Sequence, residues 1–251
     1  MSIHCCDYLD LLKQIPSNSV DLVLTDPSFG INYVNNYTHN KHSVLKGDES
    51  KFSYLELGKE AFRILKDNTA IFAFTGWSEY PEHYKQLESC GFLMKEPIIC
   101  RKRDSGTTDL FGSFQSNCDW VIFAHKGRFK FRKTELVKNK KAGVIPNKGR
   151  KPVPEYKTRF PSCWFGEEYP FSTVNSSFQK THNIHHPTIK NAEFLKWLIL
   201  LSTDENNIVV DPFVGSGSTA VAARQTNRQF IVGDISQEFI DITNNRLLKG
   251  I

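Results

Sequence analysis

The stretch "DPFVGSGST" at 211–219 combines a carboxylate with two closely spaced glycines, a pattern that is typical of ligand-binding loops. Gly215 and Gly217 let the backbone turn tightly and approach a ligand closely, and the helix expected to follow presents unpaired N–H groups there. A second apolar run, 229–233, leads to Asp234, and an acid at this point commonly binds ribose hydroxyls. Together these features predict a site for an adenosine-containing cofactor. Asp234 as a cap of the helix from 236 is an equal alternative.

Asp211 narrows the choice of cofactor. The chain has neither the GxGxxG pattern of dinucleotide-binding units nor the GK[ST] pattern of P-loops. A negative charge at the start of the loop would repel a pyrophosphate, and it suits a ligand with a positive charge or an amino group. S-adenosylmethionine carries both a sulfonium and an α-amino group. The residues therefore favour S-adenosylmethionine, and a dinucleotide-dependent oxidoreductase is the weaker alternative.

A second acidic motif, "DPSFG" at 26–30, follows the apolar run 21–25. A strand that is expected to be buried thus ends on a carboxylate, Asp26, with a proline directly behind it and an aromatic ring at Phe29. Taken alone, Asp26-Pro27 indicates only a turn after a strand. Its chemistry depends on the elements around it.

Seven apolar runs without polar alternation predict strands that are covered on both faces. They lie at 2–5, 21–25, 70–75, 97–100, 120–124, 207–210 and 229–233. Stretches with helical spacing separate most of them, at 8–15, 54–65, 79–90, 191–202, 218–225 and 236–248. The alternation predicts an α/β fold with a doubly wound, mostly parallel seven-stranded sheet, and 97–100 with 120–124 as an antiparallel hairpin at one edge.

Positive charge is concentrated in one segment. Residues 101–159 hold 16 Lys and Arg against 5 Asp and Glu, a net charge of +11, whereas the rest of the chain carries −6. Such a concentration favours a polyanionic partner, with a solvated basic loop as the alternative. The run "KGRFKFRK" at 126–133 alternates basic and aromatic residues. It is either a strand face that contacts nucleic acid or an exposed edge strand protected by lysines.

These motifs, in this order, resemble those of the amino-group DNA methyltransferases, which act on adenine N6 or cytosine N4. "DPFVGSGST" resembles their cofactor loop DPF-x-GSGTT, "DPSF" their catalytic DPPY, and "HHPTIKNAEFLKWLI" at 185–199 their HPTQKP segment. The catalytic motif comes first, a basic segment lies in the middle and the cofactor loop comes last. This order is similar to the β-type arrangement, so the resemblance implies a circularly permuted, Rossmann-like class I methyltransferase fold with a basic inserted target-recognition region.

The resemblance also implies roles for individual residues. In the catalytic tetrapeptide Asp26, Pro27, Ser28 and Phe29, the Asp26 carboxylate and the Pro27 carbonyl would hold the amino group of a flipped-out base, and Phe29 would stack on that base. The cofactor contacts would fall on Asp7, Asp211, Phe213, Gly215, Ser216, Gly217, Ser218, Asp234, His186, Thr188 and Lys190. The DNA phosphates would meet Lys126, Arg128, Lys130, Arg132, Lys133, Lys148, Arg150 and Lys151. For His186, a cap of the helix from 191 is an equal alternative.

Departures from the family pattern keep alternatives open. Ser28 stands where the family has its second proline, and Asn191 replaces the proline after Lys190. The leading expectation is a site-specific adenine-N6 methyltransferase of restriction-modification type, because cytosine-N4 members more often begin the tetrapeptide with serine. The alternatives are a cytosine-N4 enzyme and a catalytically impaired DNA-binding relative.

The expected organisation follows the same resemblance. Residues 1–125 would form the catalytic half, 126–181 the basic target-recognition region and 182–251 the cofactor-binding half. Double-stranded DNA is the expected partner, and a homodimer fits because β-type enzymes often dimerise. The six cysteines include no CxxC pair and "HNIHH" has no completing acid, so no metal is expected. No signal peptide and no apolar stretch of membrane-spanning length is found, which indicates a cytoplasmic protein.

Overall fold

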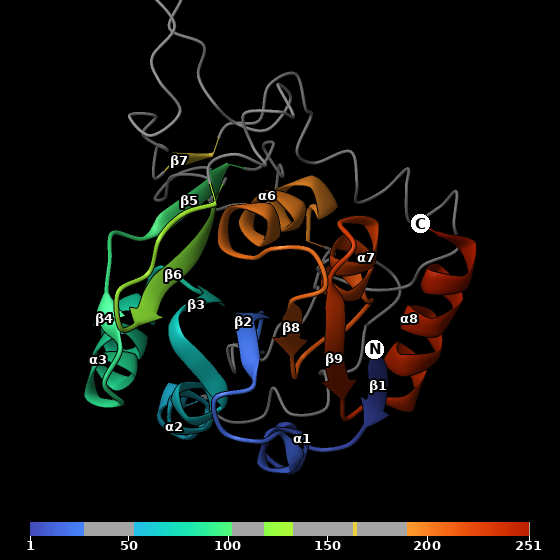
Figure 1. Ribbon diagram of the computed structural model, residues 1–251, viewed down its shortest axis with the longest axis horizontal. Coiled ribbons are helices and arrows are strands. Elements are labelled where there is room, and N and C mark those ends of the chain that lie inside the picture. Colours follow the sequence, from blue (N-terminus) through green and yellow to red (C-terminus); the bar gives the residue numbers. More distant parts are fainter. Residues whose placement is uncertain (28–52, 102–117, 133–162, 165–189, 251) are drawn as a thin grey trace, which may run out of the picture.

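A computed structural model describes residues 1–27, 53–101, 118–132, 163–164 and 190–250, and the statements below concern these residues. They form one nine-stranded sheet (Figure 1). Its strands are β1 (Ser2–Cys5), β2 (Val20–Thr25), β3 (Leu65–Thr75), β4 (Leu93–Met94), β5 (Ile98–Arg101), β6 (Cys118–Lys126), β7 (Cys163–Trp164), β8 (Ile208–Asp211) and β9 (Gln229–Asp234). The prediction of seven strands is therefore corrected. The two additional strands, β4 and β7, have two residues each, which is too short for an apolar run to indicate them.

The sheet is parallel on one side and antiparallel on the other. Its order is β1-β9-β8-β2-β3-β6-β5-β7, with β4 paired to β6. Neighbouring strands pair in parallel along the part of the sheet formed by β1, β9, β8, β2 and β3. In contrast, β6 runs antiparallel to both β3 and β5. The predicted antiparallel pairing of 97–100 with 120–124 is thus confirmed by β5 and β6. Strand β7 adds a parallel strand beyond β5.

Helices cover both faces of the sheet (Figure 1). They are α1 (Tyr8–Gln14), α2 (Tyr54–Ile64), α3 (Tyr80–Ser89), α6 (Ala192–Ser202), α7 (Ser218–Gln225) and α8 (Gln237–Lys249). One apolar cluster joins α6, α7 and α8 to one face, and a second joins α1, α2 and α3 to the other. All six helices predicted from the sequence are present, because each has an apolar stripe that the sheet covers. No helix in the described ranges is long and apolar enough to cross a membrane.

The two ends of the chain complete the same sheet. The N-terminal strand β1 pairs with β9, with Cys5 opposite Asp234, and β8 lies between β9 and β2. From β8 the chain proceeds outward to β9 on one side, whereas from β2 it proceeds to β3 on the other. Ligands of open α/β sheets bind beyond the carboxyl ends of the strands at such a reversal of strand order.

Candidate functional site at the carboxyl edge of the sheet

Four of the predicted acidic residues come to one edge of the sheet. Asp211 and Asp234 are the last residues of β8 and β9, and Asp26 and Asp7 follow shortly after the ends of β2 and β1. Because these four strands are parallel neighbours, their carboxyl ends lie together. The two acidic motifs, 185 residues apart in sequence, therefore belong to one site.

Asp211 lies at the centre of this edge and is only 2% exposed. Its Oδ1 accepts hydrogen bonds from the Thr25 hydroxyl of β2 (2.9 Å) and from the Phe213 backbone N–H (3.1 Å). Burial raises the pKa of Asp211 to about 7, and the Asp26 carboxylate adds to this rise, although hydrogen bonds from Thr219, Phe213 and Thr25 oppose it. Burial makes the negative charge of this carboxylate costly, and a positively charged ligand beside it would stabilise that charge.

Asp234 binds the glycine loop to the end of β9. Its Oδ2 accepts a hydrogen bond from the Gly215 N–H (3.0 Å) and its Oδ1 accepts one from the Ser236 N–H (2.9 Å). Burial raises the pKa of Asp234, while these N–H groups lower it. The residue that caps α8 is Ser236, so Asp234 holds the turn before the cap. Carboxylate oxygens have further lone pairs, so this structural task is compatible with a ribose contact.

Helix α8 fixes the glycine loop from behind. Gly217 has φ +89°, and a Cβ there would come within 2.8 Å of the Thr243 hydroxyl of α8. Thr243 donates a hydrogen bond to the Gly215 carbonyl (3.0 Å). The loop therefore requires glycine at 217 both for its backbone conformation and for the close approach of α8.

Arg246 of α8 holds the two predicted cofactor serines. Its guanidinium donates to the Ser216 carbonyl (2.7 Å) and to the hydroxyls of Ser216 (3.3 Å) and Ser218 (3.2 Å). Burial lowers the pKa of Arg246 to about 10. Both serine side chains thus face α8 and shape the loop. Thr243 and Arg246 were missed in the sequence, where the only available signal is that they lie three residues apart in a helix with one buried face.

Asp7 and Phe213 lie at the β1 side of the edge. The Asp7 Oδ1 accepts a hydrogen bond from the Leu9 N–H (2.8 Å), so this carboxylate is the N-cap of α1. The rings of Tyr8 and Phe213 lie 4.9 Å apart, which brings the start of α1 against the predicted cofactor loop. The structure therefore brings Asp7 and Phe213 to the same side of the site.

Asp26 forms an ion pair with Lys190. The Lys190 ammonium lies 3.1 Å from the Asp26 Oδ2, 3.7 Å from the Asp119 Oδ1 of β6 and 4.7 Å from the centre of the Phe74 ring. Burial lowers the pKa of Lys190, but Asp119 and Asp26 outweigh burial and hold that pKa well above its ordinary value. Lys190 was predicted to contact the cofactor, and the structure places its ammonium beside the carboxylate of Asp26, which was predicted to act on the substrate. Asp119 had no sequence signal.

A buried aromatic cluster supports the neighbouring end of β3. The Tyr54 hydroxyl donates to the Phe74 carbonyl, and the Tyr54 ring lies 4.0 Å from the His83 ring. The His83 Nδ1 and the Thr75 hydroxyl are 2.8 Å apart. Burial raises the pKa of Tyr54, and the nearby Asp26 charge adds to this. Helices α2 and α3 thus fix the strand whose Phe74 ring contacts the Lys190 ammonium.

Asn191 caps α6 directly after Lys190. Its Oδ1 accepts hydrogen bonds from the N–H groups of Glu193 (2.8 Å) and Phe194 (3.3 Å). The departure from the family proline therefore supplies an N-cap, which proline could not provide. Asn191 is the N-cap of this helix, whereas His186, for which a capping role was considered, lies outside the described residues.

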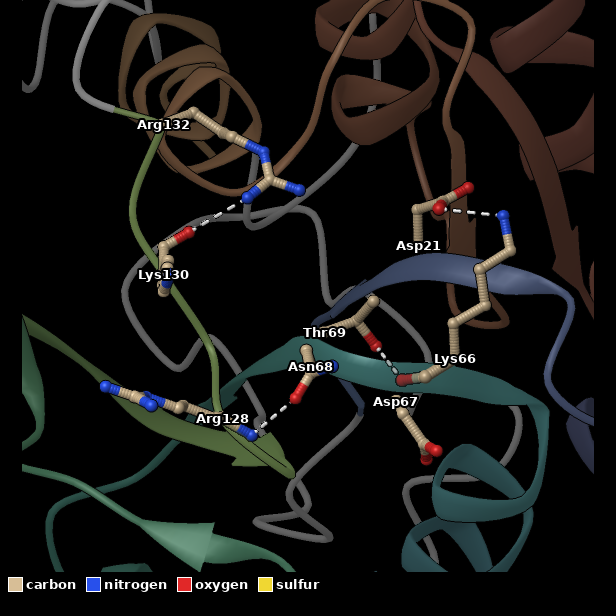
Figure 2. Close-up of a pocket in the computed structure, with 8 residues that line it drawn as sticks. All are labelled: Asp21, Lys66, Asp67, Asn68, Thr69, Arg128, Lys130 and Arg132. Carbon is tan, nitrogen blue, oxygen red and sulfur yellow. Dashed lines mark hydrogen bonds and ion pairs between the residues drawn. The ribbon is translucent and has the colours of Figure 1, made fainter.

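Predicted DNA contacts within the described ranges lie at the opposite edge of the sheet. A cavity of about 410 Å³ lies there, and Figure 2 shows the residues that line it. Its charged lining consists of Asp21, Lys66, Asp67, Arg128, Lys130 and Arg132. Asp21 lies near the start of β2, five residues before Asp26. At the usual rise per strand residue, this separation corresponds to about 17 Å. Arg128, Lys130 and Arg132 are therefore remote from the acidic site.

Lys126 performs a structural task in this region. Its ammonium donates to the carbonyls of Phe62 (3.0 Å) and Leu65 (2.8 Å) and to the Asn18 side chain (2.7 Å). These carbonyls lie at the end of α2, where backbone acceptors lack helical partners. These contacts favour a role for Lys126 in capping the C-terminal end of α2 over a role in phosphate contact.

Several predicted site residues lie outside the described residues: Ser28, Phe29, Lys133, Lys148, Arg150, Lys151, His186 and Thr188. The same holds for most of the predicted region 126–181, so the proposed division into three segments stays a prediction. Among the residues that the structure describes, no group of three or more His, Cys, Asp or Glu could hold a metal ion.

Relatives of known type match this chain over nearly its whole length. The sequence profile of the N6/N4 DNA methylase family matches residues 20–245. The type II methyltransferase M.HpaI of Haemophilus parainfluenzae is 28% identical over 97% of this chain and 73% of its own length. M2.LlaDCHI of Lactococcus lactis subsp. cremoris, also a type II methyltransferase, is 29% identical over 97% of this chain and 88% of its own.

Solved structures share the fold. The PvuII DNA methyltransferase, which is cytosine-N4-specific, superposes with a TM-score of 0.67 at 18% identity, over 100% of this chain and 93% of its own. The M1.HpyAVI complex with S-adenosylmethionine gives 0.65 at 19% identity, over 98% of both chains. The family profile spans most of the chain, including both acidic motifs. The protein therefore belongs to the N6/N4 amino-group DNA methylase family.

Proposed function

We propose that this DNA methylase transfers a methyl group from S-adenosylmethionine to the N6 of a flipped-out adenine. The observation that carries the proposal is the placement of Asp26 and the buried Asp211 at the ends of neighbouring strands, where the strand order reverses, with the Thr25 hydroxyl hydrogen-bonded to Asp211. One carboxylate suits a cationic cofactor and the other suits an amino group of the substrate. The type II relatives support a place in a restriction-modification system.

The chemistry of this edge fits S-adenosylmethionine. The cofactor supplies an electrophilic methyl group on a sulfonium and also carries an α-amino group. Asp211 would accept hydrogen bonds from that amino group, since it is the buried acid at the start of the glycine loop. Asp234 and the N–H groups of the loop would face the ribose, and Phe213 would cover the cofactor from the β1 side. The structures of M1.HpyAVI and of the Thermus thermophilus protein TTHA0409 are complexes with this cofactor, which supports the proposal.

Asp26 would act on the substrate amino group. The lone pair of an exocyclic amino group is conjugated with the base, so the nitrogen must become tetrahedral as it attacks. An ionised Asp26 and the backbone carbonyl of Pro27 would accept hydrogen bonds from the two amino hydrogens and favour that geometry. Lys190 would keep Asp26 ionised, because its ammonium lies 3.1 Å from the Asp26 Oδ2. Catalysis would consist mainly of positioning and electrostatics.

The order of the elements supports a circular permutation. The cofactor loop lies between β8 and α7 near the end of the chain, and β1 continues the sheet from β9. In this arrangement the catalytic strand β2 would precede the cofactor strand in sequence while lying beside it in space, as in the β-type enzymes that the motif order resembles.

The choice between adenine and cytosine rests on the first residue of the tetrapeptide. Asp26 favours adenine by resemblance, whereas the structural likeness to the cytosine-N4-specific PvuII enzyme keeps cytosine N4 as the second candidate. A DNA-binding relative without catalysis is the third, because of Ser28. Nucleoside mass spectrometry separates all three. Unmethylated DNA with isotope-labelled S-adenosylmethionine is expected to give labelled N6-methyladenine, whereas labelled N4-methylcytosine, or no label with bound cofactor, would contradict the proposal.

The basic residues at the opposite edge would contact DNA away from the target base. Within the described part of the chain, the Arg128 guanidinium and the Lys130 ammonium take part in no hydrogen bond or ion pair, whereas Arg132 pairs with Asp204 at 3.0 Å. The double variant Arg128→Ala/Lys130→Ala is expected to reduce the slope of log affinity against log salt by about 1.8, because each phosphate contact contributes about 0.9. The kcat at saturating DNA should be unchanged, since Asp26 is remote.

Filter-binding titrations of DNA between low and moderate salt measure that slope. A matched control removes two exposed lysines elsewhere, as Lys85→Ala/Lys249→Ala, and should leave the slope unchanged. Equal slopes for the wild type and the Arg128/Lys130 variant would contradict the assignment and favour a solvated basic surface.

A further inference from the structure

We propose that Asp119 is a positioning residue that acts through Lys190 on Asp26. This inference rests on the proposed function, since it gives Asp26 the substrate amino group. Asp119 belongs to none of the motifs that identify the family, and its position becomes informative only in the folded chain.

The direction of β6 brings Asp119 to the acidic edge. Strand β6 is antiparallel to β3, with Trp120 opposite Thr75, so the beginning of β6 lies beside the end of β3. The end of β3 is next to the end of β2, because Thr25 pairs with Ala73. Asp119 therefore approaches the site from the side opposite to the cofactor loop. Lys190, one residue before the capped start of α6, lies between Asp119 and Asp26.

The three charged groups are poorly exposed and unevenly spaced. The exposed fractions of the side chains are 14% for Lys190, 17% for Asp119 and 23% for Asp26. The ammonium is within hydrogen-bonding distance of Asp26, at 3.1 Å, whereas Asp119 attracts it from 3.7 Å. The Phe74 ring lies 4.7 Å from the ammonium and adds a cation–π contact. Asp119 and Phe74 thus determine where Lys190 lies relative to Asp26.

The arrangement divides one positive charge between two carboxylates. Lys190 restrains Oδ2 of Asp26, and the attraction of Asp119 limits how closely the ammonium approaches Asp26. Asp26 therefore keeps enough negative charge to accept a hydrogen bond from the substrate amino group. Without the Asp119 charge, the ammonium would pair more tightly with Asp26 and compete with the base.

The variant Asp119→Asn keeps the shape of the side chain and removes its charge. We expect kcat to fall about tenfold, with the Kd for S-adenosylmethionine and the KM for DNA within about twofold of the wild type, as for an interaction made mainly in the transition state. Glu205→Gln is the control, since it removes an exposed carboxylate just before β8 at the opposite edge. It should leave kcat unchanged.

A double-mutant cycle tests whether Asp119 acts through Lys190. In a Lys190→Met background, Asp119→Asn is expected to produce no further fall in kcat. An equal fall in both backgrounds, or a lowered melting temperature without a change in kcat, would overturn the inference. A wild-type protein that transfers no methyl group would overturn the proposed function and this inference with it. Methyl transfer by the wild type with an equally active Asp119→Asn variant would overturn the inference alone.

Discussion

Replacing Asp26 with alanine is expected to lower kcat at least about a thousandfold while changing the Kd for S-adenosylmethionine by less than about threefold. Asp26 directly follows the end of β2, and its carboxylate forms an ion pair with Lys190. The variant removes the carboxylate that would accept the amino hydrogens, and it leaves Asp211 and the loop in place. Lys190 keeps Asp119 as a carboxylate partner, so the fold should tolerate the change.

Single-turnover methyl transfer and calorimetric titration of the cofactor measure the two effects separately. Asp241→Ala, which removes an exposed carboxylate on α8, is the matched control and should retain full activity. If Asp26→Ala loses cofactor binding together with activity, Asp26 belongs to the cofactor pocket instead. Retention of methyl transfer would remove Asp26 from the mechanism.

Replacing Asp211 with asparagine is expected to weaken cofactor binding by about tenfold to a hundredfold without lowering the melting temperature at about pH 8. The neutral amide keeps an oxygen for the Thr25 hydroxyl and the Phe213 N–H but loses the charge that would bind the α-amino group. It also removes the cost of an ionised, buried carboxylate. Lower stability together with weaker binding would indicate that Asp211 acts mainly on the fold.

The raised pKa of Asp211 gives the wild-type protein a specific pH dependence. The folded carboxyl group keeps its proton up to about pH 7, whereas in the unfolded chain it loses the proton near its ordinary pKa of 3.8. The folded state thus binds more protons between these values, so this group's contribution to stability falls as the pH rises through that window and is lost above it. A cationic cofactor requires the ionised form, so its affinity should rise with pH up to about 7 and then level off.

Cofactor titrations from about pH 5.5 to about pH 8.5, a range that spans the raised pKa, test this behaviour with Asp211→Asn as the reference. The variant should show a flat profile over the same range, because the titrating group is absent. Asp204→Asn, an exposed substitution at the opposite edge, should reproduce the wild-type profile. A wild-type affinity that is independent of pH would contradict the assignment of Asp211 to the α-amino group.

Local sequence determined most of the elements and both acidic motifs. Apolar runs such as 21–25 and 207–210 indicated strands because parallel strands are buried on both faces, and the helices were visible from their apolar spacing. The order of the motifs also indicated the family, because Asp26 and Asp211 each come at the end of an apolar run in a short, recognisable context. The strands β4 and β7 were missed because two residues carry no periodic pattern.

Only the tertiary structure decided which charged groups act together. Asp119 reaches Lys190 because β6 reverses direction beside β3, and Arg246 holds Ser216 and Ser218 because α8 packs behind the glycine loop. The basic residues Arg128 and Lys130 follow the far end of the same β6, so they lie opposite the acidic edge, a location that their charge alone did not indicate. Residue types and spacing determine local conformation, whereas the order and direction of strands determine which side chains meet across large separations in sequence.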